Sequence, residues 1–341
     1  MALISVLDVA PVPEGGDVGE ALRNSLSLAR HAEACGYHRY WLAEHHNTAG
    51  IASSATAVLL AHAAARTSTI RVGAGGVVLT NHAPLVVAEQ FGTLAALHPG
   101  RIDLGVVRGT PLDADTATAL RRYGGADIYP DLIQELRGFF ATSSAPSPVR
   151  AIPGEGLGTP IWVLGSSLYS AFLAADLGLP FAFASHATQV GMDEALAAYR
   201  RTFRPSAQLA RPYVMACLQV FAADDAAAAR RAMSSSLLAF FAQYGGRPGL
   251  LPAAVDLDAR LSAEELDATE QLSADAVVGS PDTVRAGLAA FLDRTGADEL
   301  MVTADIHDHA TRLRSFELTA EAMRGLTGIA RPSEVIAVAA N

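Results

Sequence analysis

Short runs of hydrophobic residues alternate with longer segments in which apolar positions recur every three or four residues. The short runs predict buried β-strands, and the longer segments predict helices that pack on them. This alternation is typical of parallel strands joined by crossover helices, and eight such units favour a (β/α)8 TIM barrel over an open sheet. The strands that we expect cover residues 4–7, 40–43, 70–73, 102–106, 161–164, 181–184, 213–221 and 299–303.

The first predicted helix shows the apolar spacing on which the helix predictions rest. Leu22, Leu26, Ala29 and Ala32 fall on one face of it, and Gly36 is suited to the left-handed conformation that ends a helix. Further helices are expected over residues 54–66, 84–97, 169–177, 192–203, 223–244, 281–294 and 310–324.

Two connections are longer than the usual loop between a strand and a helix. They cover residues 107–159, with helical pieces near 113–123 and 129–140, and residues 245–279. Long connections at the C-terminal face of a barrel often serve as lids or binding loops. We therefore expect one domain over residues 1–341, with two insertions that shield a site from water.

The composition is that of a compact globular protein, because 50% of the residues are hydrophobic and 18% are charged. All 25 basic residues are Arg. The chain therefore cannot use a Lys Schiff base, a pyridoxal phosphate anchored on Lys or a Walker A lysine. A formal net charge of -10 argues against a nucleic-acid partner. We expect a small-molecule partner instead.

Cysteine is rare, since Cys35 and Cys217 stand alone and in no metal-binding spacing. This usage fits a reducing compartment. The chain starts with a strand-like run rather than a signal peptide, and no apolar run reaches the roughly 18 residues of a membrane span. We expect a cytoplasmic protein without a membrane segment.

Glu44-His45-His46-Asn47 directly follows the second predicted strand, where barrel enzymes build their active sites. Histidine titrates near neutral pH, so one ring of this pair could serve as acid, base or oxyanion partner. The alternative is that Glu44 and one His only bind backbone groups of the loop.

Gly73-Ala74-Gly75-Gly76 is expected to close the third strand. Glycine allows a flat ligand to approach the backbone closely, although such a run is more often just a tight bend. The run is not a G-x-G-x-x-G motif that opens a helix, so the dinucleotide-binding fingerprint is absent.

Arg108 follows the fourth strand, and Gly165-Ser166-Ser167 follows the fifth, just before a helix. Amide groups and hydroxyls at a helix start, together with an Arg fork, could hold one phosphate. Taken singly, each residue has a simpler explanation, because a Ser can be an ordinary helix cap and Arg108 a surface ion pair.

The remaining chemistry-bearing residues give weaker signals. His82, His186, His307 and His309 are expected near strand ends, but zinc sites need an ordered set such as an H-x-H pair on a strand. His307-Asp308-His309 follows the eighth strand, where the side chains of loop residues would diverge. We therefore predict no metal site, and solvated or capping roles for most of these residues. A serine hydrolase is not supported, because the chain has no G-x-S-x-G motif.

These motifs, in their order along the chain, resemble the bacterial luciferase-like flavin monooxygenase family. The resemblance covers almost the whole chain and rests on Ile4–Asp8, Gly36–Tyr37, Tyr40–His46, Ile70–Gly73, His98–Gly105, Leu164–Ser167, Leu177–Ala184 and Thr295–Leu300.

The resemblance implies a TIM barrel that binds reduced FMN as a diffusible co-substrate supplied by a separate flavin reductase. Oxygen would add to the flavin to give a C4a-peroxyflavin, which oxygenates a small or medium apolar organic substrate, and the protein would be a homodimer. His45 matches the catalytic histidine of the family. Gly75 and Gly76 match a pair joined by a non-proline cis peptide against the isoalloxazine, and Arg108 and Ser166–Ser167 match the phosphate-binding positions.

The chain departs from the family pattern at three places, one of which is Thr80, where close relatives commonly carry a proline. Val107 stands where light-emitting relatives carry a reactive Cys, so light emission is not implied. Leu168-Tyr169 differs from the common phosphate segment, so the resemblance does not predict what Tyr169 contacts. Two other functions stay open at this point: an F420-dependent hydride-transfer oxidoreductase on the same fold, and a non-catalytic flavin-binding subunit.

Overall fold

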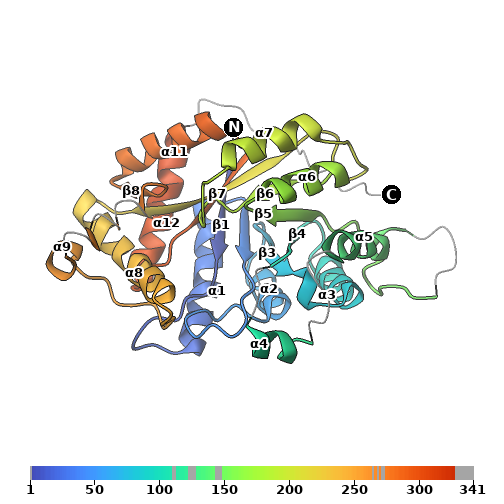
Figure 1. Ribbon diagram of the computed structural model, residues 1–341, viewed down its shortest axis with the longest axis horizontal. Helices are drawn as coiled ribbons and strands as arrows, with labels where there is room; N and C mark the ends of the chain where they lie inside the picture. Colours follow the sequence, from blue (N-terminus) through green and yellow to red (C-terminus); the bar gives the residue numbers. More distant parts are fainter. Residues whose placement is uncertain are drawn as a thin grey trace.

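The computed structural model describes residues 2–109, 113–121, 128–142, 148–262, 265–266, 269 and 273–326. Eight parallel strands close into a barrel, and helices surround it on the outside (Figure 1). The predicted TIM barrel is therefore confirmed. Its strands are β1 (Leu3–Asp8), β2 (Arg39–Leu42), β3 (Arg71–Val78), β4 (Ile102–Val107), β5 (Ile161–Gly165), β6 (Phe181–Phe183), β7 (Val214–Ala222) and β9 (Glu299–Thr303).

The barrel closes through a parallel pairing between β6 and β7, with Phe181 opposite Val214. Around the ring, the strands follow the order β6, β5, β4, β3, β2, β1, β9, β7. Because every neighbouring pair in the ring is parallel, all eight carboxyl ends meet at one rim. That rim is where a site assembled from many strand ends is expected.

The helices lie close to the predicted positions. The structure has α1 (Val18–Cys35), α2 (Thr56–Ala65), α3 (Pro84–Leu97), α4 (Ala114–Ala119), α5 (Tyr129–Phe140), α6 (Leu168–Leu177), α7 (Met192–Thr202), α8 (Ala226–Tyr244), α9 (Leu257–Arg260), α11 (Pro281–Thr295), α12 (His309–Gly325) and the short 3-10 helix η1 (Leu79–Asn81).

Helix α1 shows why these segments are helical. The Asp17 carboxylate accepts the backbone N–H of Glu20 at the start, and Gly36, with φ of 83°, ends the helix as expected. The predicted inward face is displaced by about one position. Leu22 and Leu26 are only partly buried, and the fully buried face consists of Ala21, Ser25, Leu28, Ala29 and Ala32.

Apart from single-residue shifts at strand ends, the strands differ from the predictions in two respects. The third strand does not close at the glycine run but continues through it to Val78, with a register shift between Ala74 and Val77. The second long connection also contains a short strand, β8 (Val277–Gly279), which pairs only with the far end of β7. Three residues are too few to give a readable alternation, so the sequence pattern missed this strand.

Within the residues that the structure describes, no helix is both long and apolar enough to cross a membrane.

Charged side chains fill the barrel interior near the amino ends of the strands. The buried Arg39 guanidinium donates to Glu299 Oε1 at 3.0 Å and to Asp103 Oδ2 at 2.6 Å. Arg71 also binds Asp103, and the Tyr213 hydroxyl donates to Glu299 Oε2 at 2.9 Å. Burial alone would raise the pKa of Asp103, but the two guanidinium groups hold it well below its usual range.

Aromatic rings pack directly above this charged layer. Trp41 and Trp162 meet edge to face with centroids 5.2 Å apart, and Trp162 meets Tyr213 in the same way at 5.5 Å. Gly73 makes room for them, since a Cβ atom there would lie 2.6 Å from Trp41 Nε1. These charged and aromatic side chains therefore fill the amino-end half of the barrel interior.

Replacing Arg39 with Met tests the charged layer. The variant should lose about 3 to 5 kcal/mol of unfolding free energy, because it leaves two buried carboxylates without their cation. Urea denaturation measures this loss. The control is Arg204→Met, which removes an ion pair with Asp176 on the surface. The Arg204 side chain is 75% exposed and that of Asp176 is 59% exposed. The explanation fails if both variants lose the same small amount.

Candidate functional site

A cavity of about 610 Å³ opens at the carboxyl rim of the barrel. All eight barrel strands, or the residues directly after them, contribute to its wall, and Gln243 of α8 covers one side. The side chains on its floor are mostly apolar, among them Leu7, Met215 and Met301. The cavity suits a ligand with a large apolar surface and a few polar groups.

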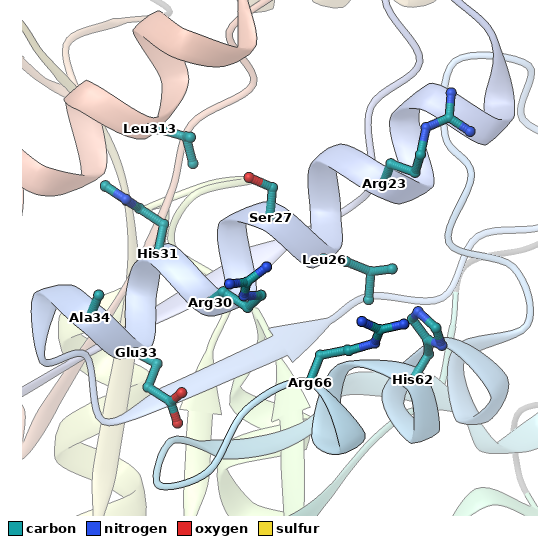
Figure 2. A pocket seen from close by; sticks show the side chains of 10 residues that line it. All are labelled: Arg23, Leu26, Ser27, Arg30, His31, Glu33, Ala34, His62, Arg66 and Leu313. Atoms are coloured by element: carbon teal, nitrogen blue, oxygen red, sulfur yellow. The ribbon is translucent and has the colours of Figure 1, made fainter.

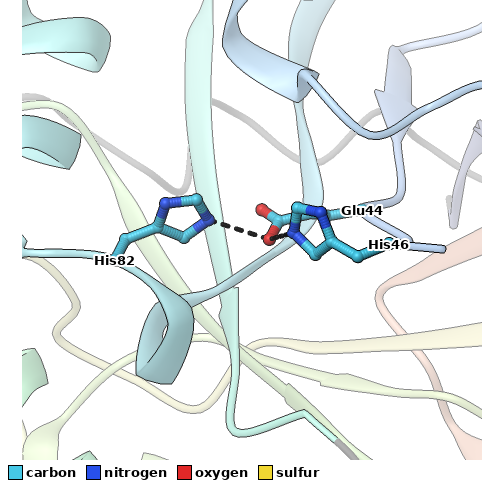
Figure 3. Close-up of side chains that lie close together, drawn as sticks. All are labelled: Glu44, His46 and His82. Carbon is cyan, nitrogen blue, oxygen red and sulfur yellow. Dashed lines mark hydrogen bonds and ion pairs between the residues drawn. The ribbon is translucent and has the colours of Figure 1, made fainter. Parts of the chain in front are cut away.

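The loop after β2 brings Glu44, His45 and His46 to this rim. The Glu44 side chain is 2% exposed, and its Oε1 atom accepts hydrogen bonds from Nε2 of His46 and Nε2 of His82, each at 2.8 Å (Figure 3). Its Oε2 atom accepts the backbone N–H of Val78 at 3.3 Å. Glu44 thus joins the loop after β2 to the end of β3. The alternative for Glu44 and one His expected bonds to backbone groups of the loop, whereas Glu44 bonds to two imidazoles and to a backbone N–H of β3.

His45 lies between Glu44 and His46 in the sequence, and it lines the cavity. Its side chain is exposed toward the cavity, and the desolvation that the surrounding protein imposes on the charged ring lowers its pKa. The Glu44 carboxylate opposes the shift only in part. His45 is therefore mostly neutral near pH 7, a state in which one ring nitrogen donates and the other accepts.

Gly75 and Gly76 form a flat part of the wall, and the peptide bond between them is cis. A Cβ atom on Gly75 would lie 2.7 Å from Leu7 Cδ1 and 3.1 Å from Trp41 Cβ. A Cβ atom on Gly76 would lie 2.8 Å from the carbonyl oxygen of Gly105. Neither position has room for a side chain, so this wall stays bare.

Arg108 stands at the rim, not inside the cavity. Its guanidinium lies 4.9 Å from the centroid of the Tyr169 ring, a cation–π contact that links the end of β4 to the start of α6. The Thr80 hydroxyl donates to the carbonyl oxygen of Arg108 at 2.8 Å. Arg108 and the serine segment before α6 are therefore neighbours, and Tyr169 supplies the contact between them.

The two serines of that segment differ in their surroundings. Ser166 is exposed and lines the cavity together with Gly165. Ser167 is the N-cap of α6, where its hydroxyl accepts the backbone N–H of Ser170 at 3.4 Å. The simpler explanation of Ser167 as a helix cap thus describes its contacts in this structure, and Ser166 is the serine that lines the cavity.

Several residues of the cavity wall were not predicted as site residues. His186 follows β6, Asn81 ends η1, and Cys217 lies on β7. Both side-chain polar atoms of Asn81 are enclosed without a hydrogen-bond partner. Burial raises the pKa of the Cys217 thiol, so it stays protonated. Only His186 had a sequence signal, as one of several histidines near strand ends.

Among the described residues, one group offers three possible metal ligands within 4.8 Å of one another: Glu44, His46 and His82. Both imidazoles already bond to the same carboxylate oxygen, so the contacts within the group explain their arrangement. His307, one of the other histidines considered as ligands, bonds through Nε2 to the carbonyl oxygen of Glu14.

A larger hollow, of about 690 Å³, lies on the outer surface beside α1 and α2 (Figure 2). Arg30, Arg66 and His62 line it. It lies away from the carboxyl rim of the barrel and lacks the mainly apolar walls of the rim cavity. We therefore take the rim cavity as the functional site.

The expected shielding by residues 107–159 and 245–279 falls partly outside the described residues. Within them, Val107 and Gly109 of the first connection line the cavity, and Gln243 lies just before the second.

The luciferase-like monooxygenase family model matches residues 3–299. The chain belongs to this family. A luciferase-like monooxygenase of Escherichia coli (strain K12) is 49% identical over 327 residues, which cover 95% of this chain and 98% of that protein. The solved structure of apo-MsnO8 is 39% identical and has a TM-score of 0.88, covering 95% of this chain and 99% of that one.

More distant structures share the fold of this luciferase-like family member. One is the oxygenating constituent of 3,6-diketocamphane monooxygenase from Pseudomonas putida in complex with FMN, at 18% identity and a TM-score of 0.69 over 94% of this chain and 97% of that one. Another is an F420-dependent secondary alcohol dehydrogenase, which is 14% identical and has a TM-score of 0.65, covering 95% of this chain and 99% of that one. The same barrel is thus found with two kinds of flavin-type cofactor.

Gly75→Ala tests the bare wall of this luciferase-like barrel. The added methyl group should press on Leu7 and cost about 1 to 3 kcal/mol of stability, as overpacking does in other cores. Gly138→Ala is the matched control, because Gly138 is exposed on α5 with nothing within 4 Å of a Cβ atom. That control should gain about 0.5 to 1 kcal/mol. Thermal unfolding of both variants measures these changes in stability. Equal stability of the two variants would contradict the claim that Gly75 has no room for a side chain.

Proposed function

We propose that this chain is an FMNH2-dependent monooxygenase that oxygenates a small or medium apolar organic molecule. One observation carries the proposal: a single cavity has a neutral imidazole and a bare glycine wall inside it, and an arginine next to a helix start at its rim. A flavin mononucleotide has a flat ring system and a terminal phosphate, and these features match the two parts of the site. The monooxygenase family of the chain supports the same reaction class.

The residues at the rim fit a phosphate group. Arg108 would give a permanently charged fork, and the Ser166 hydroxyl and the first amides of α6 would add donors. Ser167 would contribute mainly by capping α6, and so by fixing the direction of those amides. Each hydrogen bond to a charged phosphate contributes about 1.5 to 3 kcal/mol.

The residues inside the cavity fit the ring system. Gly75 and Gly76 leave space for a flat face, and Gly165 keeps the backbone beside Ser166 free of a side chain. Bound reduced FMN would supply the electrons and the oxygen-activating chemistry that the protein lacks. The protein would position the ring, exclude water and handle the protons.

His45 is the residue that we propose for proton handling. Its neutral ring can donate one hydrogen bond and accept another within the cavity, and so can stabilise an oxygen that gains negative charge or deliver a proton to it. Glu44 would act as a positioning residue, since its buried carboxylate fixes the loop that carries His45.

Two other functions compete with this proposal. An F420-dependent oxidoreductase would transfer hydride without oxygen, and a flavin-binding subunit would perform no chemistry. Titration of the pure protein with FMNH2 and with reduced F420 separates the cofactors, and an oxygen electrode separates the reactions. We expect FMNH2 to bind and oxygen to be consumed. Binding of F420 alone, or of FMNH2 without any change in its reaction with oxygen, would refute the proposal.

We also propose a homodimer and a separate flavin reductase as partners. Support for the dimer comes from α2 and α3, which carry large apolar side chains on the surface: Val58 is 69% exposed, Val86 45% and Leu97 66%. Val86 and Leu97 are eleven residues apart and so share one face of α3. Such an apolar face is typical of a surface that another chain covers. The cytoplasmic location stays a prediction.

Arg108→Met tests the phosphate contact. The variant should bind FMN about 10- to 100-fold more weakly than the native protein, because one charge-assisted contact of about 1.5 to 3 kcal/mol is lost. Its affinity for riboflavin, which has no phosphate, should not change. Arg30→Met in the outer hollow removes the same charge elsewhere and should leave both affinities intact. Flavin fluorescence measures all of them, and equal losses for FMN and riboflavin would rule out a phosphate role.

His45→Ala tests proton handling. We expect the variant to bind flavin as the native protein does. Its turnover should fall by about 100-fold or more, which is the usual range for removing a general acid or base. Oxygen uptake and product formation measure turnover. His62→Ala, on the surface of α2, is the control and should keep full rates. Full turnover of the His45 variant would remove this residue from the mechanism.

A further inference from the structure

A second imidazole faces the cavity from the wall opposite His45. His186 lies three residues beyond β6, and it lines the same cavity as His45, which follows β2. In the closed ring of strands, β2 and β6 are four strands apart in either direction. The two histidines therefore stand on diametrically opposite sides of the barrel, with the cavity between them.

The backbone around His186 is tied firmly to the neighbouring strand β7. The Gln219 side-chain amide donates to the carbonyl oxygen of His186 at 3.0 Å, and the Ser185 hydroxyl donates to the carbonyl oxygen of Cys217. The Ser185 N–H also bonds to the carbonyl oxygen of Phe183 at 2.9 Å. The position of the His186 ring is thus set by the barrel and not by a free loop.

The two nitrogens of the His186 ring have different surroundings. Nδ1 is enclosed by the protein and has no hydrogen-bond partner, whereas Nε2 is not enclosed and the ring borders the cavity. An enclosed N–H without an acceptor is less favourable than an enclosed lone pair. The neutral ring should therefore carry its proton on Nε2.

Electrostatics keep this ring neutral. Burial, with a smaller contribution from His45, lowers the pKa of His186 to about 4. At pH 7 the ring is therefore an uncharged donor in mainly apolar surroundings, next to a Cys217 thiol that also stays protonated. A neutral donor of this kind fits a neutral acceptor such as a carbonyl oxygen better than it fits an anion.

We propose that His186 donates a hydrogen bond from Nε2 to a carbonyl oxygen of the molecule held in the cavity. Two carbonyl sources are compatible with this chemistry: the ring carbonyls of a flavin, and a carbonyl group on the organic substrate. The first source rests on the proposed function, while the second needs only the cavity. His186 would then fix the orientation of the ligand from the side opposite His45.

Nitrogen NMR of the protein labelled with 15N-histidine tests the proposal without turnover. The His186 signals are assigned by their loss in His186→Gln. At pH 7 we expect a neutral ring with the proton on Nε2. Cyclohexanone should shift the Nε2 signal if the substrate supplies the carbonyl, whereas methylenecyclohexane, a hydrocarbon of similar shape, should not. FMN alone should shift it if the flavin supplies the carbonyl.

Two variants give an independent affinity test. His186→Phe keeps a ring but has no donor, while His186→Gln keeps an N–H donor. For the ligand that supplies the carbonyl, FMN or cyclohexanone, we expect about three- to tenfold weaker binding to the Phe variant and recovery in the Gln variant. Affinity for methylenecyclohexane should be the same in both variants.

A proton on Nδ1, a charged ring at pH 7, or a Nε2 signal that neither FMN nor cyclohexanone moves would overturn the proposal. A failure of this proposal can be told apart from a failure of the proposed function. If FMN binds, but neither FMN nor cyclohexanone changes the His186 signal, only the role of His186 fails. If FMN does not bind while cyclohexanone shifts the signal, the FMN-dependent function fails and the role of His186 stands.

Discussion

The backbone pairing of β6 with β7 is the contact on which the site depends. It turns eight parallel strands into a closed ring, so that every strand delivers its carboxyl end to one rim. Segments that are far apart in the chain, such as the loop after β2 and the segment between β5 and α6, then line one cavity. An open sheet with the same strands would place the segments after β2 and β6 far from each other.

The interior packing decides which end of the ring is usable. Arg39 and its two carboxylate partners fill the amino end, and Trp41 and Trp162 cover them. Beyond that layer, glycines replace large side chains on β3, and the barrel becomes hollow. A buried ion pair is weak evidence for extra stability, but here it fills a space that apolar side chains leave open and so limits ligands to one face.

The fold was predictable because strand and helix periods differ clearly, and because the number of units matched a closed barrel. The sequence did not predict β8, which has three residues, or the continuation of β3 through its glycine run. Glycine breaks the hydrophobic alternation that marks a strand, even where the strand is paired. The inward face of α1 was displaced because small residues such as Ala21 and Ser25, and not only leucines, pack against the barrel.

The candidate site was predictable to the extent that it follows strand ends. The positions of His45, Arg108 and Ser166 at one rim follow from barrel topology and from the family resemblance. The sequence did not predict the contact of Arg108 with Tyr169 or the enclosed Nδ1 of His186, since both depend on how side chains from separate strands meet. Sequence spacing carries no record of such contacts.

A crystal structure of the protein with FMN tests the central claim most directly. The account predicts the phosphate between Arg108 and the start of α6, and the ring system against Gly75 and Gly76, between His45 and His186. Density for FMN in the outer hollow beside Arg30, or a ring turned out of the barrel, would contradict it.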